Sequence, residues 1–347
     1  MSKAAELAAL IGSGQAQGDK NLIINGKFSI FQRGTGATTV NGNDVFAADR
    51  FKGWANGGGT YTVEQSTDIP NNEFEYSAKL TNTGVDSSVA AGDNYRWATD
   101  IEGYNVSQLG YGHSDAKAVT LSFWVKSSLA GTYCGALYST TASRHYIYEY
   151  TISSANTWEK KTITVSSGDT TGSWNKTNGN GLRVYWGFGS GSNYQGTAGS
   201  WTAGEKWETS NQAAWIGSAS ATFFITGVSL EIGDVATPFE HESFGGTLLK
   251  CQRYYIEFGS NGASGCFLGS TFAYVSRTIP QMRATPSISV ETLTGYIDQY
   301  GTTSRNAGSV AVSHTEGHII IYGNSMSGGS TGNPAFLRKQ TYLSAEL

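Results

Sequence analysis

Short runs of β-branched and aromatic residues, each bounded by Gly, Asn, Ser or Asp, follow one another from Asn21 onward in this chain. They read NLIINGKFSIFQRG, TYTVEQS, YSAKLTN, AVTLSFWVKSS, HYIYEYTIS, KKTITVSSG, LRVYWGFGSG and ATFFITGVSLEIG. Such runs predict short β-strands. No helical pattern of about 10–15 residues separates them, which excludes βαβ units, and no repeat period indicates a β-helix or propeller. We therefore predict an all-β chain whose residues 21–241 form an antiparallel sandwich, most simply a jelly roll.

A second series of strand patterns follows Tyr255: RYYIEFG, STFAYVSRTI, PSISVET, SVAVSHT, GHIIIYGN and AFLRKQTYLSAEL. These patterns predict a smaller C-terminal β-sandwich domain over residues 252–347. Between the two series the strand pattern breaks, and residues 242–251 permit one or two helical turns with Leu248, Leu249 and Cys251 turned inward. We expect this stretch to be a helical connector between two independent β domains.

The first 20 residues predict a short helix and a flexible linker. Leu7, Leu10 and Ile11 have the i, i+3, i+4 spacing of one helix face, and Gly12 ends the pattern. A helix of about ten residues is marginal alone in water, so this apolar face should dock on another protein or on symmetry mates. The alternative is a frayed terminus.

Composition excludes several classes of partner and compartment. The net charge is −4 and the pI about 5.8, which makes nucleic acid a poor partner. No run approaches a transmembrane span, so we expect no membrane insertion, and the N-terminus lacks the features of a signal peptide. Three cysteines without a CxxC pair predict buried free thiols in a protein synthesised in a reducing cytoplasm.

The residues capable of catalysis do not form a known motif. His241 has a carboxylate on each side and Cys251 follows ten residues later, but there is no GxSxG or zincin pattern. We therefore expect no catalytic residues and no enzyme activity. His314 and His318 could chelate zinc only if both lay on one face of a continuous strand. Gly317 between them indicates a turn instead. We expect no cofactor; a structural calcium ion with Glu231 as a ligand stays unassigned.

Aromatic residues carry the binding hypothesis. In LSFWVKSS, Trp124 points away from the face that Leu121, Phe123 and Val125 share, because successive strand residues alternate. An exposed aromatic face would stack on the C–H groups of a sugar ring. The candidate carbohydrate-binding residues are Trp124, Tyr146, Tyr148 and Trp186. The alternative is that all of these rings lie in the core or in a subunit interface.

Five segments taken together resemble a family of bacteriophage tail-fibre-like proteins of the marine phage type. They are NLIINGKFSIFQRG (21–34), FAADRFKGW (46–54), VTLSFWVKSS (119–128), ITGVSLEIGDVATPFE (225–240) and CQRYY (251–255). SKAAELAALIGSG is similar to the attachment segment of marine phage tail proteins. In that family acidic residues usually precede CQRYY, where this chain has GGTLLK. The resemblance implies a carbohydrate-binding-module-like jelly roll followed by a small β domain.

The same resemblance implies a homotrimeric virion protein, a tail fibre that binds host-surface glycan and attaches to another virion protein through its N-terminal helix. A purely structural virion protein, such as a head fibre, decoration or tail-assembly component, is one alternative. A glycan-cleaving depolymerase is another, and it requires two carboxylates facing each other across a cleft. An exposed aromatic groove favours the first function, whereas burial of the aromatic rings in symmetric contacts favours the second.

Overall fold

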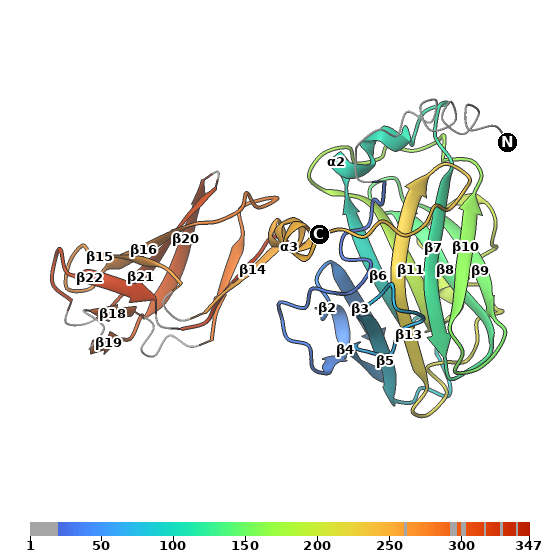
Figure 1. Ribbon diagram of the computed structural model, residues 1–347, viewed down its shortest axis with the longest axis horizontal. Coiled ribbons are helices and arrows are strands. Elements are labelled where there is room, and N and C mark those ends of the chain that lie inside the picture. Colours follow the sequence, from blue (N-terminus) through green and yellow to red (C-terminus); the bar gives the residue numbers. More distant parts are fainter. Residues whose placement is uncertain are drawn as a thin grey trace. The chain divides into compact units, whose positions relative to one another are not determined.

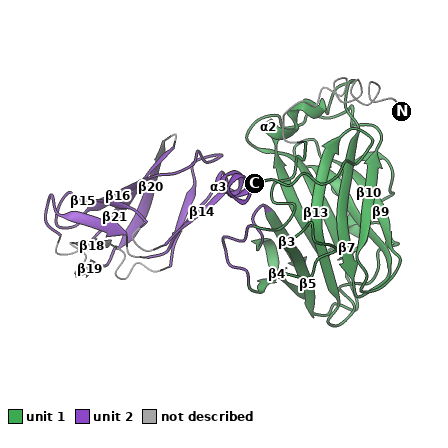
Figure 2. Ribbon diagram, viewed as in Figure 1, with its two compact units in different colours: residues 1–29, 36–47, 51–242 green, residues 30–35, 48–50, 243–347 purple. Residues whose placement is uncertain are grey.

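The computed structural model describes residues 20–259, 262–291, 297–299, 303–315, 317–326, 329–337 and 339–347. The predicted attachment helix, with Leu7, Leu10 and Ile11, lies outside these residues. The chain divides into two compact units (Figure 2). Unit 1 is 1–29, 36–47 and 51–242, and unit 2 is 30–35, 48–50 and 243–347. No helix in the described part of the chain is long and apolar enough to cross a membrane.

Two antiparallel sheets build unit 1 (Figure 1). The six-stranded sheet has the order β1 (Thr38–Val40), β4 (Thr60–Ser66), β5 (Ser77–Gly84), β13 (Thr222–Ile232), β7 (Val119–Ser127), β10 (Glu159–Val165). The seven-stranded sheet has the order β12 (Trp201–Ala203), β9 (Arg144–Ile152), β8 (Gly131–Ser139), β11 (Asn180–Ser190), β6 (Asn94–Glu102), β3 (Phe51–Asn56), β2 (Gly42–Phe46). The prediction of an all-β, antiparallel chain is confirmed.

Large aromatic rings fill the core of unit 1. Phe123 on β7 packs edge-on against Trp186 on β11 and Tyr150 on β9, with ring centroids 5.9 and 5.1 Å apart. Trp186 also lies 6.3 Å from Phe51 on β3. Because β7 belongs to one sheet and the other three strands to the second, these rings hold the two sheets together.

Residues 21–34 were predicted as a strand, and here the structure differs. The segment runs in turns, and the Asn21 side chain accepts hydrogen bonds from the backbone N–H groups of Ile23 and Leu230, each at 3.0 Å. Gly26 packs so tightly on β13 that a Cβ atom there would lie 2.0 Å from the carbonyl oxygen of Val228. An Asn side chain that takes backbone hydrogen bonds favours turns over a strand.

Unit 2 also contains two antiparallel sheets. The smaller has the order β14 (Tyr255–Phe258), β23 (Thr341–Ser344), β17 (Ser287–Val290). The larger has the order β19 (Thr303–Arg305), β18 (Ile297–Gln299), β22 (Pro334–Leu337), β15 (Ser264–Phe267), β16 (Ala273–Thr278), β21 (His318–Asn324), β20 (Ser309–Thr315).

Gly317, at φ +70°, turns the chain between β20 and β21. The two histidines that flank this turn therefore do not lie in one continuous strand, which zinc chelation would require.

A helix, α3 (Phe244–Gln252), forms where the sequence permitted one or two helical turns, and it is part of unit 2. The Ser243 side chain caps it by accepting a hydrogen bond from the N–H of Gly246 at 3.1 Å. Cys251 is buried as predicted, together with Thr247 four residues earlier on the same helix face. The inward placement of Leu249 is wrong: this side chain is 57% exposed, because it lies on the opposite side of the helix from Cys251.

Unit 2 takes in two short segments, residues 30–35 and 48–50, that the sequence analysis assigned to the first sandwich. Arg33 from the first and Arg50 from the second both pair with Glu346 near the C-terminus. Each guanidinium also lies 3.5 Å from a tyrosine ring centroid, that of Tyr255 for Arg33 and that of Tyr254 for Arg50. Segments far apart in the sequence therefore share one cluster of ion pairs and stacked rings.

Candidate functional site

The outer face of the six-stranded sheet carries the predicted platform residue. Leu121, Phe123 and Val125 point into the core, while Trp124 and Lys126 alternate outward and are half-buried, as the β7 pattern predicts. Trp124 therefore lies on the face of the sheet that is turned away from the core, and part of its ring remains accessible.

A second indole lies beside this position. Trp158, directly before β10, packs against Phe224 of β13 with ring centroids 6.1 Å apart. The Lys126 ammonium lies over both rings, 4.4 Å from the Phe224 centroid and 5.4 Å from the Trp158 centroid. A cation over aromatic faces is held by the ring quadrupoles, so this lysine is fixed in place.

Asp68 completes the group with a carboxylate. It accepts a hydrogen bond from the indole N–H of Trp158 at 2.9 Å and pairs with Lys126. Burial alone would raise the pKa of Asp68, but the hydrogen bonds from Lys126 and Trp158 outweigh burial and hold that pKa below its ordinary value. The carboxylate is therefore ionised at neutral pH and accepts further hydrogen bonds, since its side chain is 44% exposed.

The position of Trp124 is set by an irregularity in β13. The register between β13 and β7 shifts between Thr226 and Ser229, and Gly227 adopts φ +62°. A Cβ atom on Gly227 would lie 3.2 Å from Trp124 Cδ1 and 2.7 Å from the Phe74 ring, so only glycine leaves room for both rings. The bulge at Gly227 thus lets the edge of the Trp124 indole pack directly against the backbone of β13.

We call these five side chains the outer-face patch: Asp68, Trp124, Lys126, Trp158 and Phe224. The patch combines half-buried indole rings with a carboxylate and an ammonium group whose positions are fixed by mutual contacts. Indole planes pack against the C–H face of a sugar ring, while the charged groups hydrogen-bond to its hydroxyls. Strand alternation predicts the outward position of Trp124, whereas Trp158 lies outside a strand and has no such signal in the sequence.

Two of the other predicted platform residues are core residues. Trp186 is 1% exposed and Tyr148 is 3% exposed, and the Tyr148 hydroxyl donates to the Tyr185 carbonyl at 2.6 Å. Both side chains point between the sheets, because their positions on β11 and β9 alternate inward. They are inaccessible to a sugar, so the alternative of a core location holds for this pair.

Tyr146, the fourth candidate, is half-buried at the edge of the seven-stranded sheet. Its ring lies 5.5 Å from that of Trp201 on β12. Trp201 in turn packs against Trp174 at 5.6 Å and Tyr111 at 5.5 Å. Tyr146 therefore belongs to a separate aromatic cluster and not to the outer-face patch.

The outer face of the seven-stranded sheet is also aromatic, but it is covered. The Arg96 guanidinium lies 3.8 Å from the Trp207 ring centroid and 4.6 Å from that of Trp54, and all three side chains are nearly buried. Tyr194 stacks on Trp207 with centroids 4.3 Å apart. The rings of Trp54 and Trp207 are therefore closed to a ligand.

The residues considered as candidates for catalysis or metal binding have packing and hydrogen-bond contacts within the protein. His241 packs against the rings of Phe74 and Phe239, and Cys251 is fully buried. The Glu231 carboxylate accepts hydrogen bonds from the Thr237 hydroxyl at 2.6 Å and the Thr237 N–H at 3.3 Å. Within the described residues, no group of three or more His, Cys, Asp or Glu side chains is arranged to hold a metal ion.

No protein-family model matches this chain, and no curated protein matches it. Among solved structures, the enzymatically active domain of bacteriophage CBA120 tailspike protein 4 is similar over 62% of this chain and 22% of its own chain, with 13% identity and a TM-score of 0.33. This chain thus spans about a fifth of the tailspike chain.

Carbohydrate-binding modules are also similar. The family 11 module of Clostridium thermocellum matches over 60% of this chain and 99% of its own, with 10% identity and a TM-score of 0.30. TmCBM61, solved with β-1,4-galactotriose, matches over 62% of this chain and 100% of its own, with 10% identity and a TM-score of 0.27. Similarities at this level establish neither family membership nor function for the chain.

Proposed function

We propose that this protein is a non-catalytic, glycan-binding component of a bacteriophage particle, with the outer-face patch as its glycan site. The observation that carries the proposal is the pair of half-buried indoles, Trp124 and Trp158, beside the paired charges of Lys126 and Asp68. Aromatic rings that remain partly accessible next to fixed polar groups can contact the apolar face of a sugar while the polar groups bind its hydroxyls.

The placement in a tail fibre rests on the resemblance of the five sequence segments to tail-fibre-like proteins. In this proposal the first sandwich is a carbohydrate-binding-module-like jelly roll, and the N-terminal residues attach the protein to another virion protein. A single patch is expected to bind sugar weakly, because the sugar hydroxyls give up hydrogen bonds to water when they form hydrogen bonds to the protein. Three patches on a homotrimer raise the avidity by roughly two to four orders of magnitude, which suits adsorption to a cell surface.

The glycan site is tested by Trp124→Ala and Trp158→Ala. Each variant is expected to bind host-surface polysaccharide about tenfold more weakly than the wild type, since a stacking surface is lost, and the double variant more weakly still. The measurement is biolayer interferometry of purified protein on immobilised polysaccharide, with thermal melting to verify folding.

Tyr194→Ala is the matched control, because Tyr194 is a half-buried ring of the same unit that stacks on Trp207, in the aromatic cluster over the seven-stranded sheet. It is expected to leave polysaccharide binding unchanged. Loss of binding in Tyr194→Ala together with full binding in both tryptophan variants would place the glycan site on the seven-stranded sheet and contradict the proposal.

The homotrimer is tested by light scattering of the purified full chain. A mass three times that of the 36.9 kDa protomer is expected at micromolar concentration. A stable monomer under these conditions contradicts the fibre assignment but leaves the glycan site open to its own test.

A further inference from the structure

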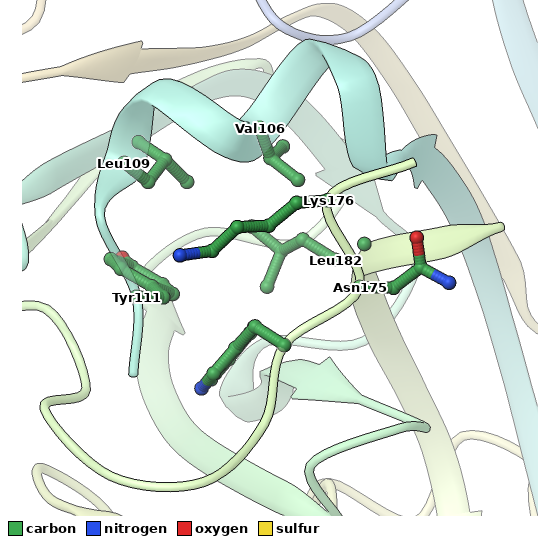
Figure 3. A pocket seen from close by; sticks show the side chains of 8 residues that line it. Val106, Leu109, Tyr111, Asn175, Lys176 and Leu182 are labelled. Atoms are coloured by element: carbon green, nitrogen blue, oxygen red, sulfur yellow. The ribbon is translucent and has the colours of Figure 1, made fainter. Parts of the chain in front are cut away.

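A small pocket lies at one end of unit 1, beneath α2 (Gly103–Val106) and the 3-10 turn η1 (Ser107–Leu109) (Figure 3). Tyr111 lines it, and the buried Tyr111 hydroxyl has no hydrogen-bond partner among the described residues. The pocket has room for about one water molecule. A water molecule satisfies such a hydroxyl, whereas a sugar ring or another organic ligand is too large to enter.

A cluster of charges in unit 2, formed by Arg33, Arg50 and Glu346, takes no part in the proposed glycan site. Nη2 of Arg33 lies 3.1 Å from one carboxylate oxygen of Glu346, and Nη1 of Arg50 pairs with the other oxygen. The Arg50 side chain is 2% exposed and that of Glu346 is 7% exposed. Because charges removed from water need close partners, the two guanidinium groups depend on this one carboxylate.

Two consecutive tyrosines at the start of β14 complete the surface that receives the arginines. The Arg33 guanidinium lies over the Tyr255 ring and the Arg50 guanidinium over the Tyr254 ring. Both rings are buried, and a cation is held most strongly by an aromatic face when water is excluded. Each guanidinium is therefore held on its edge by the carboxylate and on its flat side by a ring.

Residues 345–347 are fixed on unit 2 by contacts other than those of the two arginines. The Arg283 guanidinium donates hydrogen bonds to the carbonyl oxygens of Ala345 and Glu346, each at 2.8 Å. The Ala345 N–H donates to the Tyr254 carbonyl at 2.7 Å. These hydrogen bonds use the backbone that follows β23, so they hold the Glu346 side chain in position beside the arginines.

The two arginine-bearing segments, residues 30–35 and 48–50, are bonded to each other. The Asp49 carboxylate accepts hydrogen bonds from the Gln32 backbone N–H at 2.7 Å and from its side-chain amide at 2.6 Å. The same amide donates to the Tyr255 carbonyl at 2.9 Å. The segments therefore act as one piece, whose two arginines converge on a single carboxylate.

We propose that the Glu346 carboxylate is a latch that holds residues 30–35 and 48–50 on unit 2, and that both segments are released together when the carboxylate is lost. Without it, two guanidinium groups remain close together and shielded from water, where like charges repel strongly. The strands of unit 2 stay paired, because Glu346 lies beyond the end of β23. This inference is independent of the proposed glycan-binding function.

Hydrogen exchange of the full chain, followed by mass spectrometry, tests the latch in the Glu346→Gln variant. We expect amide exchange in residues 30–35 and 48–50 to become about tenfold faster than in the wild type, because the carboxylate shared by both arginines is gone. Residues 341–345 should keep their wild-type rates, since Arg283 still holds the backbone there. Glu291→Gln, which changes an exposed acid of the same unit, is the matched control and should alter none of these rates.

Arg50→Gln gives a second, independent reading. Because the two segments act as one piece, this variant should speed exchange in residues 30–35 as well as in 48–50. Wild-type rates in both segments of Glu346→Gln overturn the latch, and so does faster exchange in only one segment of either variant. Loss of protection throughout unit 2 in Glu346→Gln also overturns it, because Glu346 would then support the fold of the whole unit and not a separable attachment.

Discussion

Trp186→Ala is expected to lower the free energy of unfolding of unit 1 by about 3–5 kcal/mol. The indole is 1% exposed and lies between Phe51 of its own sheet and Phe123 of the facing sheet. Truncation leaves a cavity at the centre of the sandwich that the surrounding strands cannot close, because protein interiors are close-packed and rigid. Chemical denaturation followed by tryptophan fluorescence measures the change.

Two further variants separate packing from other effects. Trp186→Phe keeps an aromatic ring and removes an indole N–H that has no partner among the described residues, so it should cost clearly less than the alanine variant. Trp124→Ala removes an indole of the same size from a half-buried position on the outer face and should also cost less. If Trp124→Ala destabilises the protein as much as Trp186→Ala, Trp124 is a core residue and not a platform.

The second large effect is a pH dependence that arises from Glu208. Its side chain is fully buried beside β11, accepts a hydrogen bond from the N–H of Gly189 at 3.1 Å, and leaves its second carboxyl oxygen without a partner in the described structure. Burial raises the pKa of Glu208 to about 7 from an ordinary value of 4.5, because the charged form loses its hydration.

The direction of the pH dependence follows from the proton that Glu208 retains in the folded state. Between about pH 4.5 and 7 the folded protein holds a proton on Glu208 that the unfolded chain has released. Raising the pH through this window therefore lowers the free energy of unfolding, by about 3 kcal/mol for a shift of this size at 1.36 kcal/mol per pH unit. The stabilising contribution is complete below pH 4.5 and is gone above about pH 7.

Glu208→Gln is expected to remove this loss, since glutamine has the shape of the protonated acid and does not ionise. The free energy of unfolding, measured by urea titration at pH 5 and pH 8, should fall less with pH in Glu208→Gln than in the wild type, by about 3 kcal/mol. Glu64→Gln, which changes a half-exposed acid paired with Lys79, controls for the altered net charge. An unchanged pH dependence in Glu208→Gln would show that Glu208 is ionised in the folded protein.

Much of the strand content was predictable because alternation is a local property. TYTVEQS coincides with β4, and the inward and outward residues of β7 were assigned correctly by their period of two. Residues 21–34 were not predictable in this way, because their apolar side chains are buried through turns that depend on hydrogen bonds to β13, some 200 residues later. The membership of residues 30–35 and 48–50 in unit 2 is equally non-local, since it depends on Glu346.

The candidate site was predictable only in part for the same reason. Alternation placed Trp124 outward, but Tyr148 and Trp186 required knowledge of which face of each strand meets the other sheet. Trp158 and Asp68 come from loops about 90 residues apart, and their contact through the indole N–H arises only when the two loops meet in the folded protein. Neither residue type nor spacing gave a signal for that pair.

The central claim, that the outer-face patch binds glycan, is tested most directly by the indole N–H signals of the nine tryptophans. Protein labelled with ¹⁵N at tryptophan and titrated with fragments of the host polysaccharide should show shifts of the Trp124 and Trp158 signals, assigned from the two alanine variants. The signals of the buried Trp186 and Trp207 should stay in place. Saturable shifts confined to other tryptophans, with Trp124 and Trp158 unmoved, would contradict the account.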